Sequence, residues 1–68
     1  MILKVEFDHE EDGRWIADIP QIPGVTVYGA TKDEALRRAV TLALDVLARR
    51  VELGELPPGS LSVSVVAA

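Results

Sequence analysis

The chain opens with a regular alternation of apolar and charged residues between positions 2 and 8. The alternating residues are Leu3, Lys4, Val5, Glu6, Phe7 and Asp8. A period of two predicts a half-buried strand. The polar residues at 9–13 end in Asp-Gly and predict a hairpin loop. A second strand is predicted at 14–19, with Trp15, Ala17 and Ile19 on its apolar side.

Proline and glycine punctuate the next part of the chain. Pro20 and Pro23 have no amide hydrogen, which predicts a turn at 20–24. Residues 25–28 are β-branched or aromatic and predict a third, antiparallel strand. Thr31 precedes Glu34 by three residues, as in a capping box, in which each side chain accepts a hydrogen bond from the backbone amide of the other residue. We therefore expect a helix to begin at Lys32.

The helical pattern runs from Lys32 to about Leu53 and is followed by Gly54, Pro57 and Pro58, all of which favour a helix end. Alternation returns at 61–66 and predicts a fourth strand. The expected fold class is α+β in the order β-β-β-α-β. It comprises a small, mostly antiparallel sheet with one long helix packed on one face, in a single domain, 1–68.

The apolar surface of the predicted helix is too wide for a single contact. One stripe comprises Leu36, Val40, Ala43, Leu47 and Val51, and it is extended sideways by Ala35, Ala39, Leu42, Val46 and Leu53. An amphipathic helix needs an apolar arc of only about 100° or somewhat more. Large exposed apolar patches are uncommon on monomers. We expect the surplus, centred on Leu42 and Val46, to form a subunit interface.

Size and composition also favour an oligomer. A chain of 68 residues is near the limit at which one core offsets the conformational entropy of the chain. There is no cysteine and only one histidine, which excludes disulfides and disfavours a zinc site. We therefore predict a homo-oligomer, either a dimer or a tetramer.

The net charge of -4 argues against direct binding of nucleic acid, because phosphate groups require a basic surface. It suits a basic protein partner instead. No apolar run approaches the length of about 18 residues needed to span a membrane, and no signal segment opens the chain. We expect a soluble cytoplasmic protein without membrane contact.

Residues that could carry catalysis lack partners at recognisable spacings. The acidic residues near the hairpin loop do not follow the EF-hand pattern of calcium ligands. His9 has no serine, cysteine or aspartate at a spacing typical of a catalytic pair. Trp15 is interpreted as a core residue rather than a binding hot spot. We predict no catalytic residue, no cofactor and no metal.

The order and spacing of several motifs resemble the HicB antitoxin family. These motifs are Ile-Pro-Gln-Ile-Pro-Gly-Val at 19–25, Tyr-Gly-Ala-Thr-Lys-Asp-Glu-Ala-Leu at 28–36, the long helix and the Leu-Pro-Pro exit at 56–58. The resemblance covers almost the whole chain. It implies a partly degraded RNase H-like fold and a role as the antitoxin of a bacterial or archaeal toxin–antitoxin system.

In that family the domain binds and occludes HicA, a small basic RNA-cleaving toxin. We expect steering of such a partner by acidic residues, namely Asp8, Glu10, Glu11 and Asp12. Many members continue into a DNA-binding domain, whereas this sequence stops at Ala68, so direct DNA binding is not expected.

Two other functions remain open. One is a stand-alone oligomeric structural or small-ligand-binding module without a toxin. The other is a residual metal-dependent nuclease that uses Glu6, Asp8 and Asp18, although the four ligands of active RNase H enzymes cannot be matched residue by residue.

Overall fold

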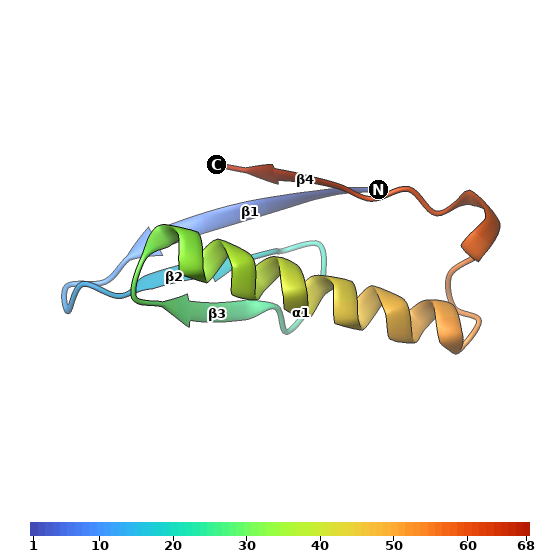
Figure 1. Ribbon diagram of the computed structural model, residues 1–68, viewed down its shortest axis with the longest axis horizontal. Helices are drawn as coiled ribbons and strands as arrows, with labels where there is room; N and C mark the ends of the chain where they lie inside the picture. The colour runs from blue at the N-terminus through green and yellow to red at the C-terminus, as the bar shows by residue number, and fades with distance from the viewer.

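The computed structural model describes residues 1–68, with the exception of the side chain of Ser60. Its elements are β1 (Ile2–His9), β2 (Trp15–Asp18), β3 (Thr26–Gly29), α1 (Lys32–Glu52), the short 3-10 helix η1 (Pro58–Ser60) and β4 (Ser64–Ala67). They form one sheet in the order β3-β2-β1-β4 (Figure 1). β1 is antiparallel to β2 and parallel to β4, and β2 is antiparallel to β3. The predicted α+β class and element order are confirmed.

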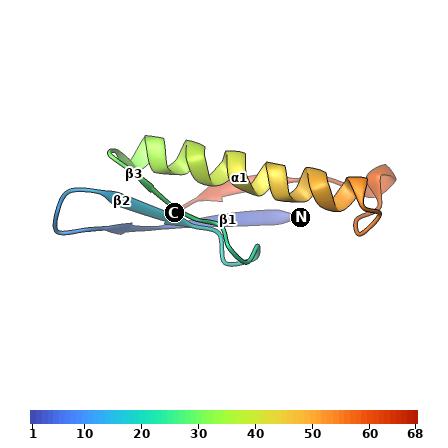
Figure 2. The same ribbon diagram turned by 90° about the horizontal axis from the view of Figure 1, so that it is seen from below.

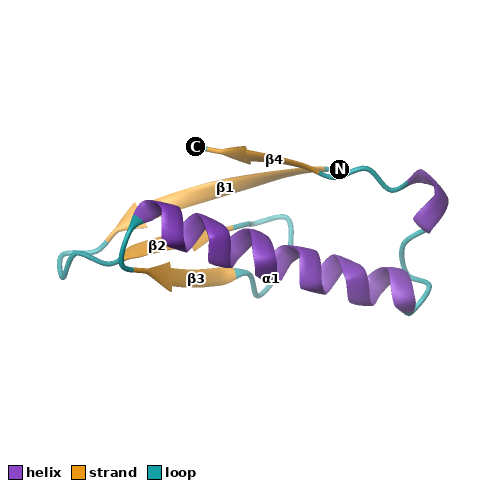
Figure 3. Ribbon diagram, in the orientation of Figure 1, coloured by secondary structure: helices purple, strands orange, loops and turns teal.

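The molecule has two layers, with α1 on one face of the sheet and the opposite face open (Figure 2). It is long and narrow, with extents of 42 × 19 × 16 Å. The β1–β2 hairpin loop and the segment containing η1 lie at opposite ends (Figure 3). The helix continues past the ends of β2 and β3, so its last turns have little sheet beneath them (Figure 1).

The fourth strand begins later than the alternation at 61–66 predicts. β4 pairs with β1 from Ile2 opposite Ser64, and the Ser64 N–H donates to the Met1 carbonyl (2.9 Å). The terminal ammonium of Met1 donates to the Ser62 carbonyl (2.6 Å). Residues 61–63 precede β4 and belong to no strand of the described structure.

The loop between β2 and β3 consists of two successive tight turns. The Ile22 N–H donates to the Ile19 carbonyl (3.0 Å), and the Val25 N–H donates to the Ile22 carbonyl (3.2 Å). Pro23 and Gly24 occupy the centre of the second turn, where Gly24 has φ +89°, as a type II turn requires. The loop thereby turns three apolar side chains into the core: Ile19, Ile22 and Val25.

Gln21, also in this loop, extends the pairing of β1 beyond the end of β2. Its side-chain oxygen accepts from the Lys4 N–H (3.3 Å), and its side-chain nitrogen donates to the Ile2 carbonyl (3.4 Å). A side-chain amide thus takes the place of a strand next to the first half of β1.

The core lies between one stripe of α1 and the covered face of the sheet. The buried helix residues are Ala35, Ala39, Ala43 and Leu47, which face Leu3, Val5, Ala17 and Ile19. The predicted central stripe is therefore rotated, because Leu36 and Val40 are only half-buried at its flank. Three of the four buried helix residues are alanines, whose small side chains let the helix lie close to the sheet.

Both helix ends have stabilising caps. The Thr31 hydroxyl accepts from the Glu34 N–H (3.1 Å), as predicted. The other half of the predicted capping box is wrong, since the Glu34 carboxylate instead pairs with Arg38 (2.9 Å). At the C-terminal end the Glu55 N–H donates to the Arg50 carbonyl (2.8 Å), and Gly54 has φ +79°, which is the geometry of a Schellman motif.

Candidate partner-binding surface

The uncovered face of the sheet brings together acidic side chains from two strands. In the β1–β2 register, Glu6 lies opposite Asp18 and Asp8 lies opposite Ile16. Residues opposite each other in an antiparallel pair point to the same side, and the neighbours on β1, Val5 and Phe7, face the helix. We refer to Glu6, Asp8 and Asp18 as the acidic face. They line a small hollow together with Ile16.

The Glu6–Asp18 pair is electrostatically unfavourable in the isolated protein. Like charges directly opposite each other across two strands destabilise a sheet. One of the two carboxylates is partly compensated, because the Thr26 hydroxyl donates to Asp18 Oδ1 (3.0 Å). A cationic partner group at this position would relieve the remaining repulsion.

The hairpin loop next to the acidic face is closed by backbone hydrogen bonds. The Glu10 N–H donates to the Arg14 carbonyl (2.8 Å), and the Gly13 N–H donates to the Glu10 carbonyl (3.0 Å). Gly13 has φ +92°, a conformation that favours glycine. Glu11 is exposed at the tip, whereas Glu10 is half-buried.

Asp12 is bound within the loop. Its Oδ1 accepts from the Arg14 backbone amide (3.0 Å), and its Oδ2 pairs with Arg14 Nε (2.7 Å). The backbone hydrogen bond from Arg14, reinforced by its side chain, holds the pKa of Asp12 below its usual range. The negative charge of Asp12 is therefore offset by Arg14, and Glu11 is the more available carboxylate for a partner.

An aromatic residue adjoins the acidic face on β3. Tyr28 pairs with Ile16 in the register and is 44% exposed. The guanidinium carbon of Arg14 lies 4.7 Å from the centre of its ring, a cation–π contact. Tyrosine and arginine are enriched among residues that contribute most to protein–protein binding. The uncovered sheet face thus has an aromatic side chain on its β3 edge and acidic side chains on β2 and β1.

The predicted partner-binding residues fall into two groups. Asp8 belongs to the acidic face, while Glu10, Glu11 and Asp12 form the loop at its end. Alternation along each strand already separated Glu6 and Asp18 from the core, but only the strand register shows that these two residues are direct neighbours.

The residues suggested for a residual nuclease do not form a metal site. Within the described part of the chain, no three histidine, cysteine, aspartate or glutamate side chains are close enough to hold a metal ion.

His9 lies on the helix-covered side of the sheet, away from the acidic face, and its ring stacks on Trp15 at 4.2 Å between centroids. Lys32 Nζ lies 4.7 Å from the centre of the Phe7 ring beside this pair. Trp15 is half-buried and packs against the core.

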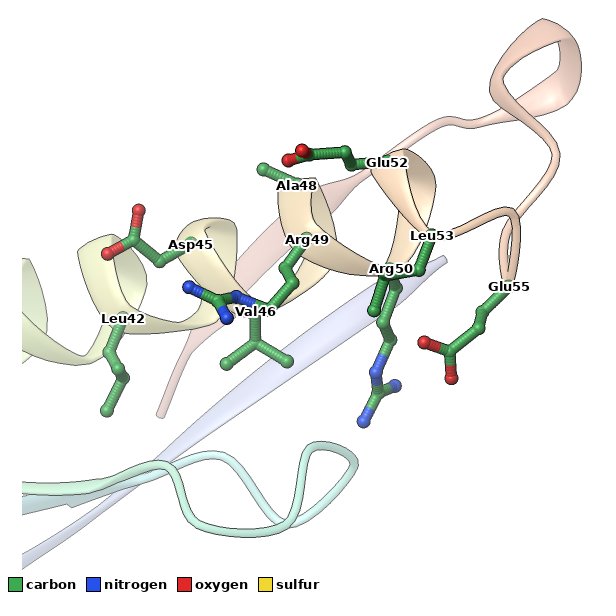
Figure 4. Close-up of a pocket in the computed structure, with 9 residues that line it drawn as sticks. All are labelled: Leu42, Asp45, Val46, Ala48, Arg49, Arg50, Glu52, Leu53 and Glu55. Atoms are coloured by element: carbon green, nitrogen blue, oxygen red, sulfur yellow. The ribbon is translucent and has the colours of Figure 1, made fainter.

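The predicted interface residues Leu42 and Val46 lie on the flank of α1. Both are half-buried and pack against the core of their own chain. Their exposed portions line a hollow along the second half of the helix (Figure 4). In this view they point toward the turn between β2 and β3, whereas Asp45 points the other way. Their place in an oligomer interface stays a prediction.

Comparison with models of protein families, with curated proteins and with solved structures found no match to this chain. No helix in the described residues is long and apolar enough to cross a membrane.

Proposed function

We propose that this protein is a non-catalytic, HicB-like antitoxin of the cytoplasm, which binds a small basic RNA-cleaving HicA-like toxin and occludes its active surface. The observation that carries this proposal is the uncovered sheet face, on which Glu6 lies directly opposite Asp18 with Asp8 beside them. The resemblance of the motifs at 19–36 to the HicB family supports the same function.

The charge distribution fits a basic partner. A chain with net charge -4 attracts a cationic protein, and charge complementarity acts mainly on the rate of association. The Glu6–Asp18 repulsion is a cost in the free protein that basic side chains of a partner would remove. Tyr28 and Ile16 supply apolar area beside the acidic face, from which a partner could exclude water.

The test begins with the open reading frames beside the gene. We expect one to encode a small basic protein whose expression stops growth and whose toxicity is relieved by co-expression of this chain. Pull-down of the two proteins should recover a stable complex. If no such reading frame exists, or if co-expression leaves the toxicity unchanged, the antitoxin function is wrong and the stand-alone oligomeric module takes its place.

The binding surface is tested by two triple variants that remove the same number of negative charges. The first neutralises the acidic face with Glu6→Gln, Asp8→Asn and Asp18→Asn. The control neutralises exposed carboxylates on and after the last turns of α1 with Asp45→Asn, Glu52→Gln and Glu55→Gln. We expect the first variant to slow association about tenfold at low salt and to weaken its salt dependence, while the control changes both much less.

A third variant, with Glu10, Glu11 and Asp12 replaced by alanine, measures the contribution of the loop. Since Asp12 is already paired with Arg14, we expect a smaller effect than for the acidic face. Equal slowing by the control triple would show that only the net charge matters and would remove the acidic face as the binding site.

A further inference from the structure

We propose that β4 is the surface on which two copies of this chain associate, through antiparallel pairing of β4 with its symmetry mate into one continuous sheet. The two-fold axis would place identical strands side by side, as in other isologous dimers. This inference is independent of the proposed toxin, because the acidic face lies on β1 and β2 and remains uncovered.

The backbone of β4 has one satisfied side and one open side. The Ser64 N–H donates to the Met1 carbonyl (2.9 Å), and the Ala68 N–H donates to the Val5 carbonyl (3.1 Å). Backbone groups alternate in direction along a strand, so those of Val65 and Ala67 point away from β1. No strand in the described part of the chain lies on that side. The open side is therefore a template for another strand.

Devices that protect sheet edges from such pairing are missing from β4. Natural edge strands are guarded by lysine, by proline, by bulges or by charges that point inward. β4 has the sequence Ser-Val-Val-Ala, and the chain carries no charged side chain between Leu56 and Ala68. All four residues of β4 are exposed in the single chain.

Exposed apolar side chains gather around the same strand. Of the eight large apolar side chains that are exposed in the described structure, five lie on β4 or on the segments that adjoin it: Met1, Ile2, Leu61, Val65 and Val66. On the helix side, Val65 and Ala67 line a groove with four residues of α1, namely Leu36, Arg37, Val40 and Thr41. A second copy would close this groove from its open side and continue the sheet at the same time.

The charge of the chain favours an identical partner here over a foreign one. Each copy carries a net charge of -4, so two copies repel each other wherever acidic residues meet. The stretch from Leu56 to Ala68 has no acidic side chain, so contact there avoids the repulsion between acidic residues. The β4 surface offers no acidic side chain to a basic partner, which is attracted to the acidic face instead.

The chain exposes more surface than a compact monomer of its size, which is consistent with the proposed dimer. The chain exposes 4584 Å², whereas a compact monomer of 7.4 kDa exposes about 4200 Å². Its radius of gyration is 12.8 Å, against about 11 Å for a compact domain of this length. The excess of about 400 Å² is half of what each partner buries in an interface of standard size, about 800 Å².

Amide hydrogen exchange on the wild-type protein tests the pairing directly. In a single chain the amides of Val65 and Ala67 have no acceptor and should exchange at the unprotected rate. In the proposed dimer they donate to the second copy, and we expect protection of at least about tenfold at micromolar concentration. Unprotected Val65 and Ala67 amides beside protected Ser64 and Ala68 amides would overturn the proposal.

Light scattering on three variants locates the interface. We expect a wild-type mass of two or four times 7.4 kDa and half that mass for Val65→Pro, which removes an outward amide without breaking a bond to β1. Leu53→Lys changes the most exposed apolar residue, 66% exposed, at the far end of α1 and should leave the mass unchanged. A wild-type monomer, or dissociation by Leu42→Glu but not by Val65→Pro, would show that β4 is not the interface.

Discussion

The two edges of the sheet differ in how the chain protects them. At the β3 edge the helix lies close, and an Arg38 guanidinium nitrogen donates to the Tyr28 carbonyl at 2.9 Å. That bond occupies an acceptor on the outer side of the edge strand. At the β4 edge all four strand residues are exposed and no side chain carries a charge. One edge is thus closed by the chain itself, while the other is left open to a second strand.

The difference follows from the width of a single helix. An α-helix with its side chains is about 10–12 Å across, and neighbouring strands are about 4.8 Å apart. One helix therefore covers two to three strands of the four. α1 packs mainly on β3 and β2, less on β1. The described residues contain no second helix over β4, which is the strand that we propose a second copy covers.

The largest effect is expected where the helix approaches the β3 edge most closely. A Cβ at Gly29 would lie 2.5 Å from the Ala35 backbone nitrogen and 3.0 Å from the Thr31 carbonyl oxygen. Backbone atoms cannot move aside as a side chain can, so we expect Gly29→Ala to lower the free energy of unfolding by about 1–3 kcal/mol. Urea denaturation measures this directly.

Gly59→Ala is the matched control, because a Cβ at Gly59 meets no atom within 4 Å and the backbone there does not have positive φ. It should change the urea midpoint little. Equal midpoints for Gly29→Ala and the wild type would mean that the helix is not held against β3 at this position.

The same substitution in both edge strands compares their packing. Val27 on β3 is half-buried and contacts the core, whereas Val65 on β4 is 41% exposed. Loss of two buried carbons costs about 0.8 kcal/mol each when burial is complete, so Val27→Ala should destabilise by about 1 kcal/mol. Val65→Ala should cost less than about 0.5 kcal/mol in dilute, dissociated protein.

If a second copy binds to β4, the difference in destabilisation between Val27→Ala and Val65→Ala should depend on protein concentration. Raising the protein concentration should increase the cost of Val65→Ala toward that of Val27→Ala, because Val65 becomes buried only in the dimer. Denaturation at two concentrations a hundredfold apart would detect this. A cost that does not depend on concentration would contradict the proposed role of β4.

Periodicity and turn chemistry predicted the elements because each of these signals is local. Alternation at 2–8, the prolines at 20 and 23 and the Thr31 cap all act within a few residues. The register that sets Glu6 opposite Asp18 could not be predicted, since it depends on the residue count and closure of the hairpin loop. The sequence also could not predict that the β3 edge is protected and the β4 edge is open, because this difference depends on where the helix crosses the sheet.

The position of the buried stripe on α1 could not be predicted from the sequence either. The helical wheel placed Leu36 in the predicted stripe and Ala35 at its side. In the structure Ala35 is fully buried, because Gly29 lets the first turn of the helix approach the sheet backbone. The contact between Gly29 and Ala35 depends on how the helix packs on the sheet, and this packing decides which face is central. A sequence pattern does not contain that information.

The smallest effect is expected from comparing Arg38, which donates a hydrogen bond to the edge strand β3, with Arg37, which forms only an ion pair within the helix. Arg37 and Arg38 each form an i,i+4 ion pair, with Asp33 at 3.2 Å and with Glu34 at 2.9 Å. Both pairs are at the surface, although Glu34 is half-buried, so each contributes only about 0.3–0.5 kcal/mol. Arg38 alone also donates to the Tyr28 carbonyl on the edge of β3. Arg38→Ala should therefore destabilise more than Arg37→Ala, by about 0.5 kcal/mol.

The same pair of variants tests the protective role of Arg38 beyond stability. Removing its side chain frees the Tyr28 carbonyl and exposes the β3 edge to pairing with other chains. We expect Arg38→Ala to add a slow, concentration-dependent association that light scattering detects, and we expect Arg37→Ala to behave as the wild type. Because both variants lose one positive charge from adjacent helix positions, a change in net charge cannot account for a difference between them. Identical stability and identical association of the two variants would show that the β3 edge is protected by the packed helix alone, and that the Arg38 hydrogen bond has no part in it.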